Sequence, residues 1–165
     1  MKKRKISIST IILIIVFLVG LSVMLYPAVS DYWNSKTQSH AIAEYDEILN
    51  NMDDKQYQKL LSEAEDYNER LKSLYSPLEN YSEIEGYENS LDVTGTGIMG
   101  YVTIPEISVE LPIYHGTSDE VLNVAVGHVQ GSTLPIGGKS THSVISAHRG
   151  LPSAKLFSDL DELSE

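Results

Sequence analysis

The chain has 165 residues, of which 42% are hydrophobic, contains no cysteine and carries a formal charge of −11. Residues 2–5 hold four of the twelve basic side chains, whereas residues 31–165 hold all 23 acidic side chains and only 8 basic ones, a net charge of −15. Such an acidic surface repels nucleic acid phosphates, and a chain without cysteine has no disulfide, thiolate zinc site or thiol redox centre of its own.

The first predicted element is a membrane-spanning helix over residues 6–30, a segment without any charged residue. An α-helix needs roughly 20 apolar residues to cross the hydrocarbon core of a bilayer, and this segment meets that length. By the positive-inside rule, the basic residues before it predict that residues 1–5 lie in the cytoplasm. The bulk of the chain is then expected on the extracellular face of the cell membrane.

A cleaved signal peptide is the alternative to this single-pass anchor, because Ala28-Val29-Ser30 is a passable cleavage site. The apolar segment is longer than the ~7–15 residues of a typical signal peptide, so an uncleaved signal anchor is favoured. Tyr26, Tyr32 and Trp33 also fit the aromatic belt of a membrane interface.

Residues 31–92 are predicted to form an extracellular helical stalk and linker. Apolar residues recur at spacings of three and four in two stretches, which predicts antiparallel helices over about 38–51 and 55–75. Asp53 and Asp54 can cap the second helix. The apolar stripes could serve a dimerising coiled coil, but two heptads per helix are short for one, so packing on the chain's own globular domain is favoured.

Residues 93–165 are predicted to be rich in short strands. Strands are expected over 99–105, 109–114 and 143–148, a helical turn running into a strand over 121–128, and a short helix over 153–163. Strands at this spacing suggest a barrel or sandwich, of which this segment supplies about half, leaving an unpaired strand edge. The expected fold class is therefore mainly β, with an N-terminal transmembrane helix and a helical stalk.

Several motifs resemble ligand sites but fail in their context. The glycines of residues 95–100 precede a predicted strand, whereas a dinucleotide fingerprint follows one, and residues 138–141 lack the first glycine of a phosphate-binding loop. Four histidines show neither zinc-protease spacing nor a matched carboxylate: His115, His128, His142 and His148. We therefore expect no cofactor and no metal. The linker tyrosines either cover a groove or are solvated: Tyr75, Tyr81 and Tyr87.

His148 is the candidate catalytic residue. It ends the apolar strand predicted over 143–148 and precedes an Arg-Gly-Leu-Pro turn (149–152), where a scaffold can aim a side chain at a groove. A lone histidine at a strand end is usually structural. Histidine is also the natural partner of a thiolate, as the group that protonates a leaving amine. Thiol chemistry needs both groups, and these 165 residues supply only the histidine.

Residues 97–163 closely resemble the sortase family, specifically its pilus-building class C members. The most specific runs are LPIYHGT (111–117), LPIGGKSTHSVISAHRGLPSAKLF (134–157) and DLDEL (159–163). The basic N-terminus, the apolar segment and the helical region containing Tyr67-Asn68 also resemble that class.

This resemblance implies an eight-stranded β-barrel on the outer face of a Gram-positive membrane, of which residues 93–165 are the first half. It implies a cysteine-type transpeptidase that cleaves the Thr–Gly bond of LPXTG-like sorting signals. In class C enzymes a lysine of the next pilin then resolves the acyl-enzyme, which builds the pilus on the cell wall. The acid/base histidine carries over to His148, whereas the cysteine and the substrate-holding arginine have no counterpart here.

The chain is therefore expected to be the N-terminal portion of such an enzyme, cut short and inactive alone. The implied partners are pilin or surface-protein sorting signals, the lipid bilayer through residues 6–30, and a separate chain that could supply the missing strands. Ser76-Pro77-Leu78 departs from the Asp-Pro-aromatic lid of the class, so no lid function is transferred. Two alternatives stay open: a membrane-tethered, non-catalytic binding module, and a structural anchor that works through the stalk.

Overall fold

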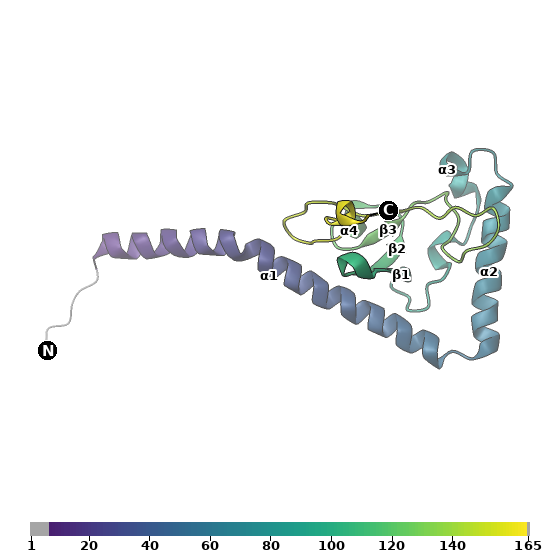
Figure 1. Cartoon of the computed structure of the whole chain (residues 1–165), viewed down its shortest axis with the longest axis horizontal. Helices are drawn as coiled ribbons and strands as arrows, with labels where there is room; N and C mark the ends of the chain where they lie inside the picture. Colours follow the sequence, from purple (N-terminus) through teal and green to yellow (C-terminus); the bar gives the residue numbers. More distant parts are fainter. Residues whose placement is uncertain (1–6, 165) are drawn as a thin grey trace.

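The structure, a computed structural model, describes residues 7–164. Four α-helices and four strands follow one another with short 3-10 turns between them (Figure 1). Their bounds are α1 (Ile8–Asn51), α2 (Asp54–Lys72), α3 (Pro77–Asn80), β1 (Ile98–Ile104), β2 (Val109–His115), α4 (Asp119–Leu122), β3 (Val126–His128) and β4 (Ile145–Ser146).

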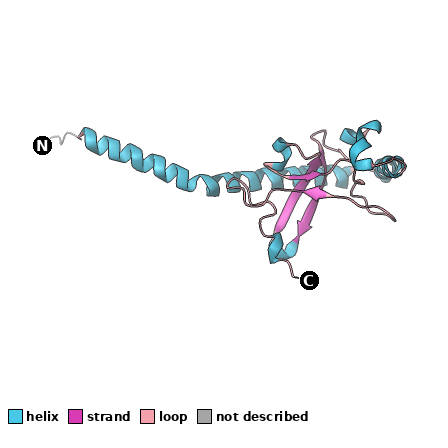
Figure 2. Ribbon diagram, turned by 90° about the horizontal axis from the view of Figure 1, so that it is seen from above, coloured by secondary structure: helices cyan, strands magenta, loops and turns pink. Residues whose placement is uncertain are grey.

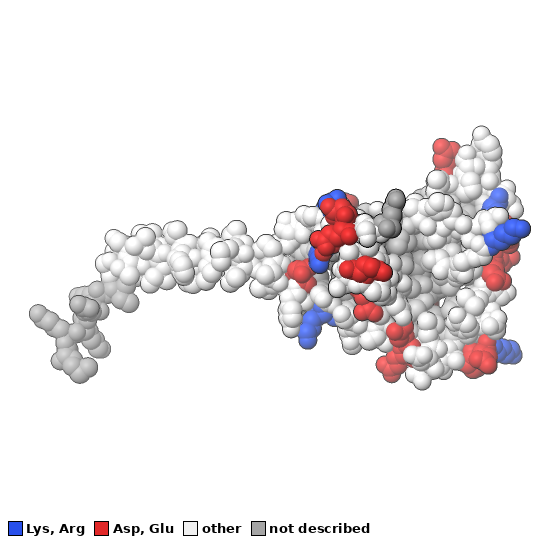
Figure 3. Space-filling model, viewed as in Figure 1, with Lys and Arg blue, Asp and Glu red and all other residues white. Residues whose placement is uncertain are grey.

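The helix α1 is continuous over 44 residues, so the apolar segment and the helix expected over 38–51 form one element. Glycine is absent between residues 21 and 51, which leaves Pro27 as the one strong helix breaker there. A proline inside a helix removes one backbone hydrogen bond and bends the axis, and α1 changes direction in its middle part (Figure 1). The N-terminal half of α1 carries no charged side chain (Figure 3).

Within residues 7–164, α1 is the one helix long and apolar enough to cross a membrane. Its C-terminal half crosses the sheet and contacts β1 and β2 (Figure 2). Ile42 and Tyr45 are buried there, and the Tyr45 hydroxyl donates to the Met99 carbonyl oxygen at 3.0 Å. Burial raises the pKa of Tyr45 to about 12, so this hydroxyl keeps its proton at neutral pH.

The helix α2 begins with a capping box, as the acidic residues before it predict. The Gln56 amide donates to the Asp53 carboxylate at 2.7 Å, and the Asp53 amide donates to the Gln56 side chain at 3.2 Å. The buried residues Ala64, Tyr67 and Leu71 belong to the hydrophobic core of the domain. The prediction that this stripe packs on the chain's own domain is therefore confirmed.

The helices α1 and α2 do not form the antiparallel pair that was expected. They diverge from the turn at Met52 and Asp53, and the body of the domain lies between their far ends (Figure 1). The physical reason is that each apolar stripe finds its partner in the domain: Tyr45 at β1, and Tyr67 with Leu71 in the core.

The four strands form one sheet in the order β1-β2-β3-β4. β1 and β2 are antiparallel, β2 and β3 are parallel, and β3 and β4 are antiparallel. Pro112 lies in β2 opposite Tyr101, but β3 pairs only from Ile113 onward, so the missing N–H of the proline faces no neighbouring strand. The sheet edges are thus β1 and the two-residue strand β4.

Two predicted elements are wrong in extent or type. The strand expected over 143–148 pairs only at Ile145 and Ser146. The helix expected over 153–163 is a series of turns with one 3-10 turn at Leu160–Glu162. Its backbone donors are used elsewhere, because the Lys155 amide donates to Asp31 and the Phe157 amide donates to the His148 carbonyl.

The core joins α2, the linker, the sheet and the segment after β4. Its apolar members are Ala64, Tyr67, Leu71, Tyr87, Leu91, Met99, Ile107, Val109, Leu111, Ile113, Val126, Leu134, Ala154, Leu156 and Phe157. Helical residues outnumber strand residues in the described chain, since α1 alone has 44. The expected mainly β character therefore holds only for the part from β1 onward.

Gly131 allows a close approach between two segments. Its φ is +86°, and a Cβ there would lie 2.6 Å from the Leu78 Cα and from the Pro77 carbonyl oxygen. We predict that Gly131→Ala lowers the free energy of unfolding by about 1–3 kcal/mol more than Gly137→Ala. Gly137 also has positive φ, +75°, but its Cβ would meet nothing within 4 Å, so it controls for backbone strain alone.

Chemical denaturation of the full chain in detergent, followed by circular dichroism, measures both values. Equal losses for the two variants would show that the segment around Pro77 does not press against Gly131.

Candidate functional site

His148 lies two residues after β4, and its side chain is exposed. The His148 carbonyl accepts the Phe157 amide at 3.2 Å, and the Gly150 amide donates to the Ser158 hydroxyl at 3.0 Å. These two bonds close residues 149–158 into a loop, which we call the His148 loop. The imidazole is thus accessible to a reactant, whereas a histidine sealed in the core could not exchange protons with one.

Two ion pairs join the His148 loop to the residues that follow it. The Arg149 guanidinium lies 2.7 Å from the Asp161 carboxylate, and the Lys155 amine lies 2.5 Å from the Asp159 carboxylate. Both cations are more than half exposed, so water screens the pairs and their net stabilisation is small. Burial of Ala154, Leu156 and Phe157 against the core contributes more to holding the loop in place.

A buried polar network lies beneath the other end of the sheet. Tyr87 and His128 are both buried, and the Tyr87 hydroxyl lies 2.9 Å from His128 Nδ1. The same hydroxyl accepts the Gly116 amide at 2.9 Å, while His128 Nε2 lies 3.0 Å from the Thr133 carbonyl. A carbonyl can only accept, so Nε2 carries the proton and Nδ1 accepts from Tyr87.

Burial sets the protonation of this network. It lowers the pKa of His128 from its ordinary value of 6.5 and raises the pKa of Tyr87. Both groups are therefore neutral at physiological pH, which is the state that the hydrogen bonds require. Each nitrogen of the neutral His128 ring has its own partner: Nδ1 accepts from the Tyr87 hydroxyl and Nε2 donates to the Thr133 carbonyl. We therefore assign this network a structural role.

His115 joins the linker to β2. It is buried, and its Nδ1 and Nε2 atoms each lie 2.8 Å from a carbonyl oxygen, that of Gly97 and that of Ser90. A neutral imidazole has one N–H and can donate to only one of these carbonyls, whereas an imidazolium donates to both. His115 also packs edge-on against the Tyr87 ring, with centroids 5.0 Å apart.

Sequence reasoning named His148 as the catalytic candidate and missed the structural roles of His115 and His128. His115 and His128 were considered only as metal ligands, and among residues 7–164 no group of three or more His, Asp or Glu side chains is arranged to hold a metal ion. The signal was present, because each histidine ends an apolar strand, and the two residues are register partners in β2 and β3. Of the linker tyrosines, Tyr87 is buried while Tyr75 is 87% exposed.

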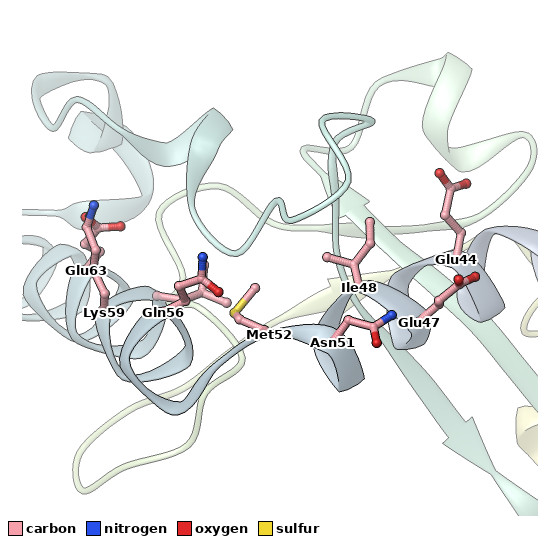
Figure 4. A pocket seen from close by; sticks show the side chains of 9 residues that line it. Glu44, Glu47, Ile48, Asn51, Met52, Gln56, Lys59 and Glu63 are labelled. Carbon is pink, nitrogen blue, oxygen red and sulfur yellow. The ribbon is translucent and has the colours of Figure 1, made fainter.

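Several hollows border α1, and two of them bear on the site. The larger, about 670 Å³, lies between α1 and α2 and has Glu44, Glu47 and Glu63 on its walls (Figure 4). His148 is not among its lining residues. A second hollow of about 400 Å³ lies where Pro27 and Ala28 of α1 face the His148 loop.

Comparison with known proteins gives the following matches. The sortase domain family model matches residues 102–165. The crystal structure of sortase C1 from Streptococcus agalactiae is 44% identical to the chain, with a TM-score of 0.66 over 76% of this chain and 65% of that one. That of sortase C from Streptococcus pneumoniae is 40% identical, with a TM-score of 0.65 over 76% of this chain and 64% of that one.

The chain thus spans just under two thirds of the length of these solved relatives. Comparison with curated proteins gives no match.

The two core tyrosines provide a matched pair of predictions. Tyr87→Phe leaves the Gly116 amide and His128 Nδ1 without their partner, so we expect a loss of about 1–3 kcal/mol in the free energy of unfolding. Tyr67 is equally buried, but its hydroxyl has no hydrogen-bond partner in the described part of the chain. Tyr67→Phe should therefore cost little or nothing.

Denaturation of the full chain, monitored by near-ultraviolet circular dichroism, measures both variants. An equal cost for the two substitutions would contradict the assigned network.

The buried state of His128 predicts a pH dependence of stability. Its folded pKa is depressed, so below the ordinary value of 6.5 the unfolded chain binds a proton that the folded chain does not. This contribution to stability is fully present above about pH 7.5 and is lost as the pH falls through 6.5. An NMR titration of the His128 ring between pH 7.5 and 5.5 should give a midpoint below 6.5, and a midpoint at or above it would refute the assignment.

Proposed function

Since the chain belongs to the sortase family, and to its class C, we propose that it is the membrane-anchored, histidine-bearing part of a sortase-type transpeptidase. The proposed activity cleaves LPXTG-like sorting signals and joins pilin subunits. The observation that carries the proposal is the exposed His148 just beyond β4, at the start of a loop closed by two hydrogen bonds. The Streptococcus pneumoniae relative, whose structure was described in terms of pilin substrate specificity, supports the substrate class.

In the proposed reaction, a cysteine thiolate attacks the carbonyl carbon of the Thr–Gly bond in the sorting signal. His148 protonates the amine of the departing glycine, and a thioester forms between cysteine and threonine. A lysine amine of the next pilin then attacks the thioester. His148 accepts the proton of that amine, an amide bond forms and the cysteine thiolate is released. Each half-reaction thus moves one proton through His148.

These 165 residues hold no thiol, so by themselves they cannot form the thioester. We propose that they are catalytically incomplete without strands that bring a cysteine and an arginine. The sheet offers a place for such strands, because β4 contributes only Ile145 and Ser146 and pairs with β3 alone.

The anchor and its direction are part of the same proposal. The apolar half of α1 spans the membrane, residues 1–5 stay in the cytoplasm, and residues 31–165 lie outside. Residues 31–92 then connect the membrane to a partial barrel over 93–165.

The open sheet edge also favours a second candidate, a tethered module that binds a strand without chemistry. An extended peptide can add to an exposed edge through main-chain hydrogen bonds. Here the strand would be a sorting signal, or a separate chain that carries the missing part of the barrel.

A chimera tests the proposed role of His148. The strands of Streptococcus agalactiae sortase C1 that follow the matched region are fused after residue 164, and cleavage of a sorting-signal peptide with an added amine is measured. We expect activity in the chimera and a loss of at least about 100-fold in its His148→Ala variant, the lower range for a lost acid/base group. His142→Ala is the control, since His142 is also exposed and lies six residues earlier.

Full activity in the His148→Ala chimera would refute the acid/base role. Acyl transfer by the 165 residues alone would refute their catalytic incompleteness. Circular dichroism of each chimera establishes that it is folded before activity is compared.

A further inference from the structure

One face of α1 makes polar contacts with the folded domain just beyond the apolar segment. The Asp31 carboxylate accepts the Lys155 amide at 2.8 Å, and the Asn34 side chain donates to the Ser153 carbonyl at 2.8 Å. One turn further, the Gln38 side chain donates to the Val124 carbonyl at 2.6 Å. Spacings of three and four residues place these side chains on the same face of the helix.

The first two contacts both end on the His148 loop. Lys155 and Ser153 are in the part of that loop where a helix was expected and turns are found. The Lys155 amide and the Ser153 carbonyl are hydrogen-bonded to side chains of α1 instead of to backbone groups within a helix of their own. The bond from the Lys155 amide to the Asp31 carboxylate is charge-assisted, which makes it the stronger of the two.

Small and apolar residues of both segments lie beside these bonds. Pro27 and Ala28 of α1 face Leu151 and Ala154 of the loop across the hollow of about 400 Å³, and Ala154 is buried. The loop is therefore seated on α1 at its middle, while its two ends are fixed at His148 and Ser158.

The sequence defines where along α1 the loop is bound. Asp31 is the first charged residue after the apolar segment, and Asn34 follows within one turn. Because α1 is unbroken and rises 1.5 Å per residue, both lie within about 6 Å of the point where the apolar segment ends. If that segment spans a bilayer, the His148 loop lies at the membrane surface.

We propose that Asp31 and Asn34 are positioning residues that hold the His148 loop on the membrane helix, so that the anchor itself fixes the histidine at the bilayer surface. This inference rests on the proposed function for the role of His148 and for the membrane location. It assigns to α1 a task beyond tethering, because the helix supplies the hydrogen-bond partners that keep the loop in one conformation.

The test uses the full chain in phosphatidylcholine nanodiscs and measures amide hydrogen exchange by NMR. Asp31→Ala removes the acceptor, so the Lys155 amide should exchange roughly tenfold faster or more, and the Arg149 and Gly150 resonances should shift. Asp31→Asn keeps an acceptor oxygen and should restore most of the protection. Ser35→Ala is the control, because Ser35 is exposed on another face of the same turn.

Wild-type exchange of the Lys155 amide in Asp31→Ala would overturn the positioning role. Asn34→Ala provides a second variant that keeps the charge of Asp31, and it should loosen the loop at Ser153. These measurements need no substrate, so they fail or succeed independently of the transpeptidase proposal.

The absence of cysteine makes a depth measurement straightforward. Pro152→Cys, at an exposed position in the loop, carries a nitroxide spin label, and Lys139→Cys carries the same label at an exposed position away from α1. We expect the label at residue 152 to collide more with lipid-dissolved oxygen than the label at residue 139. Equal collision rates for the two labels would overturn the surface location of the loop.

Discussion

The hydroxyl group of Tyr87 joins the linker to the ends of β2 and β3. It accepts from Gly116 after β2, donates to His128 at the end of β3, and belongs to a linker without long secondary structure. A four-stranded sheet with a two-residue final strand has few backbone bonds of its own. Buried side-chain bonds, neutral because burial disfavours charge, take their place at the strand ends.

The helix α2 is also joined to the sheet domain by buried side-chain hydrogen bonds. Asn68 of α2 binds Leu134 through both its side-chain oxygen, at 2.7 Å from the amide, and its side-chain nitrogen, at 3.4 Å from the carbonyl. An amide side chain thereby pairs with the backbone much as a neighbouring strand would. With Tyr67 and Leu71 in the core, α2 is a structural layer of the domain, whereas a free stalk would leave these groups in water.

Patterns that depend on local physics were predicted correctly: the capped helix α2 and the strands β1 and β2. The predictions that were wrong concern segments whose structure depends on residues far away in the sequence. The helix expected over 153–163 does not form, because its Lys155 and Phe157 amides donate to Asp31 and to the His148 carbonyl instead. The spacing of apolar residues carries no information about such distant acceptors. The continuity of α1 was missed because a membrane span and a surface helix were treated as separate elements. The catalytic role of His148 remains a prediction, since exposure permits proton transfer without demonstrating it.

The unbroken course of α1 restricts how its length can vary. Each residue turns an α-helix by about 100°, so one residue inserted between Pro27 and Asp31 would rotate the folded domain, with Asp31 still bound to Lys155, about the helix axis relative to the apolar half of α1. Insertions of three or four residues would nearly preserve the rotational phase but would lift the domain by about one turn. A flexible linker tolerates any change of length, whereas an unbroken helix couples the displacement of the domain along the helix axis to its rotation about that axis.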